Sequence, residues 1–281
     1  MSTPPGDLSA GRITPDNQVP LRFHAELDPG WNILFAFGGS TMGTAMQAAR
    51  AALTQPEFAM LSANASYLSP VQCGPVVLDA RRLRAGKGAE QISVDVSQGK
   101  PDQSLLHLVA SFGPRRETDT DFTGLSAPDV PFHSELSTVE ARSGSRMAMV
   151  PYYHSIEARP ITPDVAAGSR AEPSWRGWYR LRNTPRLPGG ELDPAAYACA
   201  CDMIGPALRM ARGRSAPPIL LVSLEIALHI LAPTAGEWLL QDTQILHAGN
   251  GYVTGIVHLW DEEKKLVAHA LQRAVIRPRA F

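Results

Sequence analysis

The chain has 281 residues, of which 44% are apolar and 19% are charged. This length suits two domains or one large domain, and the apolar share is enough for a sizeable core. Lys and Arg number 26 and Asp and Glu number 27, so the formal net charge is −1. A dedicated nucleic-acid-binding protein usually carries a basic excess, so this balance argues against that class.

The number and spacing of the cysteines and histidines, together with the apolar stretches, exclude further classes of protein. Three cysteines are too few for a disulfide scaffold, and neither they nor the eight histidines have metal-ligand spacing. We therefore expect no metal and no cofactor. The N-terminus has no signal-peptide pattern. The most apolar stretch, 216–233, includes Glu225 and His229, which favours a buried strand over a membrane span. We expect a cytoplasmic protein.

The elements of the first half are predicted in a simple order. Residues 1–19 are polar and proline-rich, as in a disordered tail. A strand is predicted over 21–27, and an alanine-rich helix with an apolar face over 37–53. Turn residues then separate four more predicted strands, at 59–69, 75–86, 88–98 and 104–113. Residues 115–150 lose this periodicity and are predicted to form a linker.

The second half repeats this plan. Two strands are predicted first, over 152–160 and 174–183. An apolar helix over 194–210 follows, with a kink expected at Pro206. The last four predicted strands are 219–231, 236–249, 251–261 and 265–277.

A constant offset in position relates the two halves. The same separation lies between Pro70 and Pro233, between the turns at 85–88 and 248–251, and between Val94 and Val257. One such coincidence is weak, but three together with a matching order of elements indicate an internal duplication. Each unit is then an α+β unit in which an antiparallel sheet wraps one helix.

Three polar residues stand out from their surroundings. Asp202 is the only charged residue of the apolar helix between positions 194 and 208, and Gln272 lies on an otherwise apolar face of the last strand. Such groups, when buried, need hydrogen-bond partners or a function. An exposed or capping aspartate and a core glutamine bonded to backbone are the alternatives. Ser223 is a weaker candidate, because its environment also fits an ordinary strand serine.

Several common catalytic patterns are missing. The GGSTMG segment does not fit the G-x-S-x-G pattern of a nucleophile elbow. The sequence has no G-x-x-x-x-G-K-[ST] and no G-x-G-x-x-G, so a Walker-type or Rossmann-type nucleotide site is not expected.

The motifs that remain resemble one family. The first half contains GGSTMGTAMQAARAAL, SYLSP and LHLVASFG, and the second contains SIEARPI, EPSWRGWYRLR, GEWLL and LVAHALQRAVIR. In this order over residues 20–280 the chain resembles the bacterial acyl-CoA thioesterase II family. The resemblance implies a tandem double hotdog of fold class α+β, in agreement with the duplication.

The family carries a catalytic Asp on the second helix, a Thr or Ser on the next strand and a Gln on the last strand. The resemblance therefore implies catalytic roles for Asp202, Ser223 and Gln272, with Ser in place of the commoner Thr. A histidine that some relatives carry before the SYL segment is Ser62 here, and we give it no role.

The expected chemistry is hydrolysis of an acyl-CoA thioester. Asp202 would act as general base on a water that Ser223 and Gln272 orient. Backbone N–H groups of Gly38 and Gly39, at a helix start, are candidates to stabilise the oxyanion. Four apolar residues of the two helices are candidates to line the acyl site, with simple core packing as the alternative: Met42, Met46, Tyr197 and Met203. Four cations on one edge are candidates for CoA phosphate contacts, with a solvated strand face as the alternative: Arg81, Arg82, Arg84 and Lys87.

Two other interpretations stay open, a non-catalytic acyl-binding double hotdog and a thioesterase for carrier-protein-bound acyl groups. A hotdog dehydratase is disfavoured because Asp202 lacks the histidine five residues later that marks such enzymes. We expect an N-terminal hotdog over 20–114 and a C-terminal hotdog over 151–281. The C-terminal hotdog would carry Asp202, Ser223 and Gln272, the catalytic trio. Open sheet edges make a homo-oligomer the expected assembly.

Overall fold

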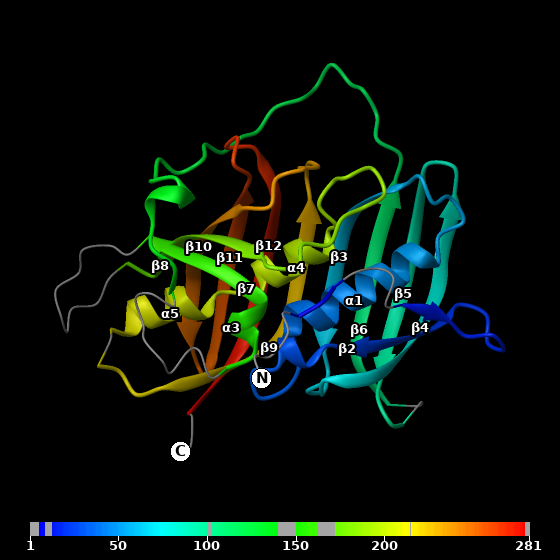
Figure 1. Ribbon diagram of the computed structural model, residues 1–281, viewed down its shortest axis with the longest axis horizontal. Helices are drawn as coiled ribbons and strands as arrows, with labels where there is room; N and C mark the ends of the chain where they lie inside the picture. The colour runs from blue at the N-terminus through cyan, green and yellow to red at the C-terminus, as the bar shows by residue number, and fades with distance from the viewer. Residues whose placement is uncertain are drawn as a thin grey trace.

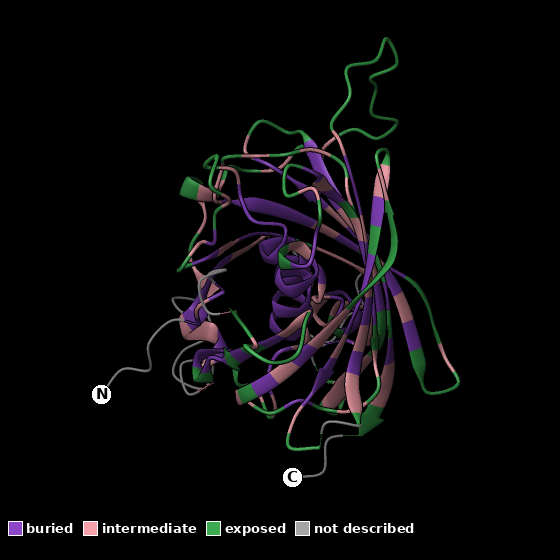
Figure 2. Ribbon diagram, turned by 90° about the vertical axis from the view of Figure 1, so that its right-hand side faces the viewer, coloured by how far each residue is buried: buried purple, intermediate pink, exposed green. Residues whose placement is uncertain are grey.

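The computed structural model describes residues 6–8, 13–100, 103–139, 150–161, 172–213 and 215–278. One long curved sheet wraps around two central helices, α1 (Gly38–Ala51) and α4 (Ala195–Cys201) (Figure 1). In Figure 2 both helices are coloured as buried and lie inside the curve of the sheet. Small side chains allow this enclosure, because α4 consists of alanine and cysteine apart from Tyr197.

The first half contributes six strands. These are β1 (Thr14–Pro15), β2 (Arg22–Leu27), β3 (Ala59–Tyr67), β4 (Gly74–Gly86), β5 (Ala89–Ser97) and β6 (Ser104–Gly113). A short 3-10 helix, η2 (Pro29–Trp31), precedes α1.

The second half contributes the other described strands. These are β7 (Ile156–Ile161), β8 (Ser174–Leu181), β9 (Ile219–Ile230), β10 (Leu239–Gly249), β11 (Tyr252–Trp260) and β12 (Leu266–Pro278). Its helices besides α4 are η3 (His133–Glu135), α3 (Tyr152–Ser155) and α5 (Gly205–Arg212).

The sheet runs in the order β1-β2-β4-β5-β6-β3-β9-β12-β11-β10-β8-β7, and all its neighbouring strands are antiparallel. The two halves join through β3 and β9, whose pairing covers residues 62–66 and 225–229. The central pair, Asn64 and Ala227, is separated by the same offset that relates the two halves in the sequence. The α1 and α4 helices also contact each other at the centre.

β-Bulges repeat at the same offset. Leu61 is the unpaired extra residue of β3, and Leu224 is that of β9. Leu83 of β4 and Leu246 of β10 are a second such pair. A bulge inserts one residue and bends its strand, so it is a feature of the backbone that a duplication would carry over. The structure thus supports the internal duplication that the sequence indicates.

Two segments differ from their predicted structures. In the predicted tail 1–19, Leu8 is 3% exposed and β1 pairs with β2, while residues 1–5 and 9–12 lie outside the described part. The side chain of Asp16 accepts from the N–H groups of Gln18 and Val19, and this turn lets the polar segment add to the sheet. The strand predicted over 152–160 begins instead with the one-turn helix α3, and its extended part is β7.

The predicted linker crosses between the halves and packs on the second. Of residues 115–150, positions 140–149 lie outside the described residues. Val130 and Leu136 pack on a second apolar cluster that contains Trp178 and Trp238. His133 stacks on Trp238, with ring centroids 4.5 Å apart. The linker is therefore anchored to the C-terminal half of the sheet.

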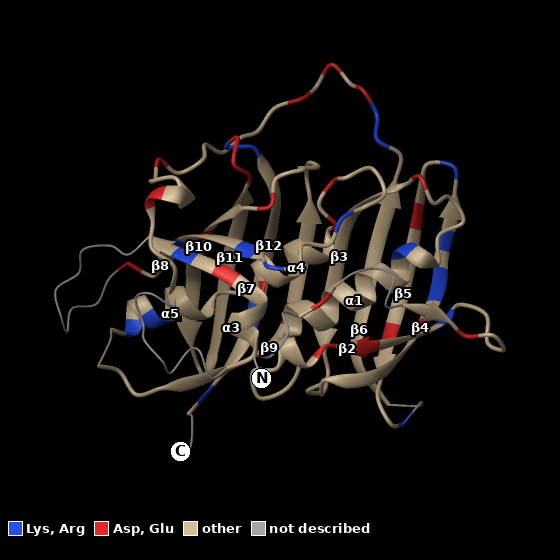
Figure 3. Ribbon diagram, in the orientation of Figure 1, with Lys and Arg blue, Asp and Glu red and all other residues tan. Residues whose placement is uncertain are grey.

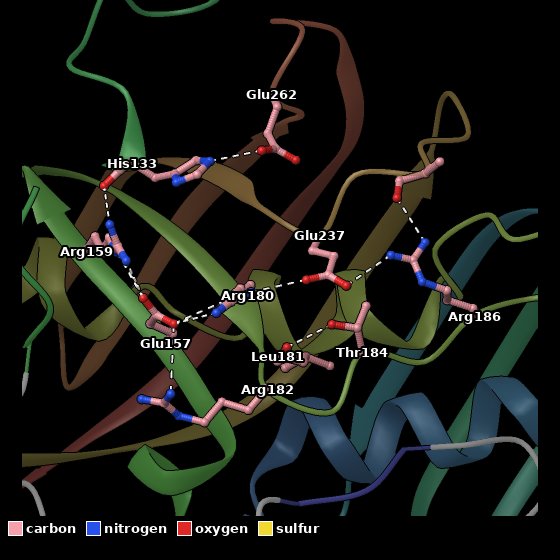
Figure 4. Close-up of polar contacts among 11 residues, drawn as sticks. His133, Glu157, Arg159, Arg180, Leu181, Arg182, Thr184, Arg186, Glu237 and Glu262 are labelled. Carbon is pink, nitrogen blue, oxygen red and sulfur yellow. Dashed lines mark hydrogen bonds and ion pairs between the residues drawn. The ribbon is translucent and has the colours of Figure 1, made fainter. Parts of the chain in front are cut away.

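A charged network on β7 and β8 supports this anchor (Figure 4). Glu157, 5% exposed, pairs with Arg159 at 2.7 Å and with Arg180 at 2.8 Å. Burial would raise the pKa of Glu157, but hydrogen bonds from these arginines hold it below its usual value. Arg159 also donates to the carbonyl of His133. These cations are engaged in structural contacts.

Figure 3 shows Lys, Arg, Asp and Glu distributed over both halves of the sheet and the connecting loops, whereas α4 carries no charge. Of the four cations considered for CoA phosphates, Arg82 donates to the carbonyl of Ala52 at the end of α1. Within the described ranges, no helix has the length and apolar character needed to cross a membrane.

Candidate active site

Asp202 lies where the second central helix is interrupted. The sequence predicts one helix kinked at Pro206, but α4 ends at Cys201 and α5 begins at Gly205. Pro206 has no N–H to donate to the carbonyl of Asp202, four residues earlier, and its ring would clash with that carbonyl in a continuous helix. Asp202 leaves the helical conformation with ψ of 50°. The break frees its side chain to turn toward the sheet.

The Asp202 carboxylate accepts hydrogen bonds from three directions. Ser223 Oγ donates to Oδ1 at 2.9 Å, and Gln272 Nε2 donates to the same oxygen. The Gly39 N–H donates to Oδ2 at 2.9 Å. The structure therefore brings together Asp202, Ser223 and Gln272, which lie far apart in the sequence.

The amide of Gln272 has a defined orientation. Its Oε1 accepts from the N–H of Ile204 at 3.3 Å, in the break between α4 and α5. Its Nε2 consequently faces Asp202 Oδ1 and Ser223 Oγ. The hydrogen bond from Nε2 to Ser223 Oγ is 2.8 Å long. Gln272 is 3% exposed, so each of its polar atoms needs a partner, and this network supplies one.

Burial changes the acidity of Asp202. It raises the pKa of the carboxyl to about 7, although hydrogen bonds from Ser223, Gly39 and Gln272 act in the opposite direction. A carboxylate of this pKa is ionised in a large fraction of molecules at neutral pH and is basic enough to take a proton from a bound water. Shifts of this kind are found in catalytic acids and in catalytic bases.

The two glycines predicted to stabilise an oxyanion lie beside this carboxylate. A Cβ at Gly38 would come within 2.5 Å of Asp202 Oδ2, and a Cβ at Gly39 within 2.6 Å of the Cys199 Cα. Both positions therefore need glycine for close approach. The Gly39 N–H is committed to Asp202, which leaves Gly38 as the candidate oxyanion donor.

Tyr67 is a neighbour of the site that the sequence analysis did not single out. It ends β3, and its hydroxyl donates to the carbonyl of Gly38 at 3.0 Å. Burial, with a smaller effect of the Asp202 charge, raises the pKa of Tyr67 well above its usual value. The SYLSP motif contained this residue, but nothing in that pattern showed that it would reach the start of α1.

The apolar residues considered for the acyl site lie around the central helices. Met42 and Met46 are 0% and 1% exposed and belong to the main core, so a role in acyl binding stays a prediction for them. Met203 accepts a hydrogen bond from the Tyr152 hydroxyl on Sδ at 3.3 Å. Tyr197 is buried near the other end of α4.

The candidate site draws on both halves of the chain. The trio comes from the second half, whereas Gly38, Gly39 and Tyr67 come from the first. In the part of the chain that the structure describes, no group of three or more His, Cys, Asp or Glu side chains is placed to hold a metal ion.

Comparison with known proteins gives the family. The acyl-CoA thioesterase N-terminal domain family matches residues 27–113, and the acyl-CoA thioesterase C-terminal domain family matches residues 126–276. The second match alone spans more than half of the chain. The chain belongs to the acyl-CoA thioesterase family, and this membership supports thioester hydrolysis as its class of activity.

Solved structures show the same fold. A hot dog fold protein of unknown function from Alicyclobacillus acidocaldarius is 22% identical, with a TM-score of 0.78 over 97% of this chain and 98% of that chain. The acyl-CoA thioesterase II TesB2 from Mycobacterium marinum is 18% identical, with a TM-score of 0.69 over 94% and 96%. A Mycobacterium avium subspecies paratuberculosis tesB protein is 16% identical, with a TM-score of 0.71 over 95% and 96%. The comparison with curated proteins returned no match. The predicted α+β double hotdog is thus confirmed.

Proposed function

We propose that the protein is an acyl-CoA thioesterase that hydrolyses the thioester to a free acid and CoA. The observation that carries the proposal is the Asp202 carboxylate, held by Ser223, Gln272 and Gly39, with a pKa raised to about 7. Membership of the thioesterase family supports the reaction class. The geometry supports a general base, because the carboxylate is oriented on both oxygens and is poorly solvated.

In the proposed mechanism, Asp202 takes a proton from a water as the water oxygen attacks the thioester carbonyl carbon. Ser223 and Gln272 fix the carboxylate, and the fixed carboxylate orients the water, which lowers the entropic cost of the attack. The Gly38 N–H, in the first turn of α1, stabilises the oxyanion of the tetrahedral intermediate. The intermediate collapses with cleavage of the carbon–sulfur bond, and the departing thiolate takes the proton back from Asp202.

The best test is release of thiol from a panel of short, medium, long and aromatic acyl-CoAs, with Asp202→Asn measured in parallel. Release from one or more substrates by the wild type, lost in the variant, is the expected result. A folded wild type that releases no thiol would contradict the acyl-CoA proposal. Acyl-carrier-protein substrates and acyl-CoA affinity would then separate a carrier-protein thioesterase from an acyl-binding protein.

Three further predictions from the sequence belong to this proposal. The hotdog units at 20–114 and 151–281, with a linker over 115–150, are proposed as the functional domains. Residues 162–171, 214 and 279–281 of the second unit lie outside the described part. A cytoplasmic location and a homo-oligomeric state are proposed as well; size-exclusion chromatography with light scattering tests the latter.

A further inference from the structure

Gln241 is a buried amide next to the candidate active site that the proposed mechanism does not use. It lies on the inner face of β10, which α4 and α5 contact (Figure 1). Its side chain is 0% exposed, and its Nε2 donates to the carbonyl of Ala200 at 2.6 Å. A carbonyl oxygen can only accept, so this contact fixes which end of the amide faces α4. Ala200 lies in the last turn of α4, two residues before Asp202.

The Ala200 carbonyl lacks the partner that a continuous helix would give it. In an α-helix the N–H of a residue donates to the carbonyl four residues earlier, so the donor for Ala200 would be Ile204. The Ile204 N–H donates instead to Gln272 Oε1, at 3.3 Å. Two glutamines therefore satisfy the two ends of one missing helix hydrogen bond. Gln241 takes the carbonyl, and Gln272 takes the N–H.

The first half has the apolar counterpart of this arrangement. The strands β4 and β10 correspond, because their bulges at Leu83 and Leu246 lie at the constant offset between the halves. At that offset Leu78 corresponds to Gln241. The α1 helix contacts β4 and runs from Gly38 to Ala51 without a break. The helix over the leucine is thus continuous, and the helix over the glutamine is interrupted.

Proline alone does not explain the open hydrogen bond. Pro206 acts on the carbonyl of Asp202, through its missing N–H and its ring, and neither effect involves the bond between Ile204 and Ala200. Gln241 also has a cost of its own, because its Oε1 is buried without a hydrogen-bond partner among the described residues. The contribution of this amide to the fold is therefore the contact of its Nε2 with the Ala200 carbonyl.

We propose that Gln241 is a positioning residue of the active site, which keeps the helix open between Ala200 and Ile204. With the Ala200 carbonyl occupied, the Ile204 N–H stays with Gln272 Oε1. The Nε2 of Gln272 then stays directed at the Asp202 carboxylate. Gln241 thus acts through Gln272 rather than on the carboxylate itself. As a role in catalysis, this inference rests on the proposed thioesterase function.

The test is the pKa of the Asp202 carboxyl in Gln241→Met, measured by carbon-13 NMR titration of protein labelled on its aspartate carboxyl groups. The Asp202 resonance is the one that Asp202→Asn removes. Without the amide, the Ile204 N–H is free to return to the Ala200 carbonyl. Gln272 then loses its orientation, and Asp202 loses a hydrogen bond that lowers its pKa. The pKa is expected to rise from about 7 in the wild type by roughly half to one pH unit.

Thr243→Val is the matched control. Thr243 lies two residues further along β10 on the same inner face, is 0% exposed, and has no hydrogen-bond partner for its Oγ1 among the described residues. The substitution keeps the size of the side chain and removes no hydrogen bond, so the pKa of Asp202 is expected to stay at about 7. An unchanged pKa in Gln241→Met, or equal shifts in both variants, would overturn the proposal. Gln241→Asn, which is one methylene shorter, takes the place of Gln241→Met if that variant does not fold.

Steady-state kinetics give a second readout. A displaced carboxylate is expected to lower turnover roughly 10- to 100-fold in Gln241→Met, with kcat and kcat/KM falling together. Combined with Gln272→Ala, Gln241→Met should add little further loss, because the two residues act through one chain of hydrogen bonds. Additive losses would contradict an action through Gln272. Absence of thiol release by the wild type would overturn the proposed function alone, because the NMR titration needs no substrate and still decides the role of Gln241.

Discussion

The N-terminal and C-terminal halves of this protein have the same backbone plan but different chemistry. In the second half, Asp202, Ser223 and Gln272 form one hydrogen-bonded group. At the constant offset between the halves, Gly39 corresponds to Asp202 and Met60 corresponds to Ser223. Gln272 pairs with Ile226 across the sheet, and the related pair in the first half is Ala110 with Ala63. The first half therefore lacks all three polar groups.

The comparison also shows what the first half still contributes. Gly39, at the position related to Asp202, donates its N–H to the Asp202 carboxylate. The absence of a side chain at Gly38 gives that carboxylate room. The second half thus supplies the proposed general base, and the first half supplies the backbone against which it packs. In the described residues, both halves thus contribute to one candidate site.

The largest expected effect is that of Asp202→Asn. Loss of a general base costs roughly 100- to 10,000-fold in turnover, and a fall in this range is expected with the fold intact. Asp261→Asn is the matched control, since Asp261 is also a buried carboxylate and accepts from the N–H groups of Glu263 and Lys265 in a turn. Similar losses in both variants would show that the effect is structural.

The contribution of the first half is tested by Gly38→Ala. The new Cβ would lie 2.5 Å from Asp202 Oδ2 and 3.1 Å from the Tyr67 ring, so the carboxylate must move. A displacement of this size costs about 100-fold in turnover. Gly205→Ala is the control, because its Cβ would meet only Leu221, at 3.6 Å. If Gly38→Ala retained full turnover, the first half would not be needed to position Asp202.

Stability provides a third comparison. The raised pKa means that the folded protein keeps a proton on Asp202 up to about pH 7, whereas the unfolded chain loses it near the ordinary value of 3.8. The folded state binds more protons in this window, so this group makes stability fall as pH rises from about 4 to about 7. Relative to the wild type, Asp202→Asn should gain up to about 4 kcal/mol between pH 4 and pH 8.

Denaturant unfolding of both proteins at several pH values measures this difference. Asp261→Asn serves again as the control, because it too replaces a buried carboxylate by an amide, at a distance from the trio. A free-energy difference between Asp202→Asn and the wild type that stays constant from pH 4 to pH 8 would be incompatible with a raised pKa at Asp202.

The smallest expected effect is that of Tyr67→Phe. The Tyr67 hydroxyl donates to the carbonyl of Gly38. Ile230, which corresponds to Tyr67 at the constant offset between the halves, has no hydroxyl. Loss of one hydrogen bond of about 1 kcal/mol predicts a fall in turnover of roughly fivefold. Steady-state kinetics would separate this from a binding effect, which would raise KM alone. Turnover equal to that of the wild type would assign Tyr67 a packing role only.

Part of this site could be predicted from the sequence because its residues break local patterns. Asp202 is a charge in an apolar helix and Gln272 is an amide on an apolar strand face, so each is visible from its neighbours. Ser223 on its own resembles an ordinary strand serine, and only the family resemblance favoured it. The strands and the duplication followed from periodicity, turn residues and the constant offset.

The remaining features depend on contacts between distant segments. The position of the helix break at Asp202, rather than at Pro206, follows from what proline does to the preceding turn. The commitment of the Gly39 N–H to Asp202 joins residues from the two halves of the chain, and no local pattern reports it. The same holds for the Tyr67 contact with Gly38, and for the way β1 extends the sheet where composition alone predicts disorder.

The most direct test of the central claim is the pH dependence of kcat/KM for thioester hydrolysis. It reports the pKa of the essential base in the free enzyme. With Asp202 as that base, kcat/KM should rise with pH and level off above an apparent pKa of about 7. Gln272→Ala removes a hydrogen bond that lowers this pKa, so the midpoint should move upward in that variant. A profile that stays flat from pH 5 to pH 9 in the folded wild type would contradict the assignment of Asp202 as the base.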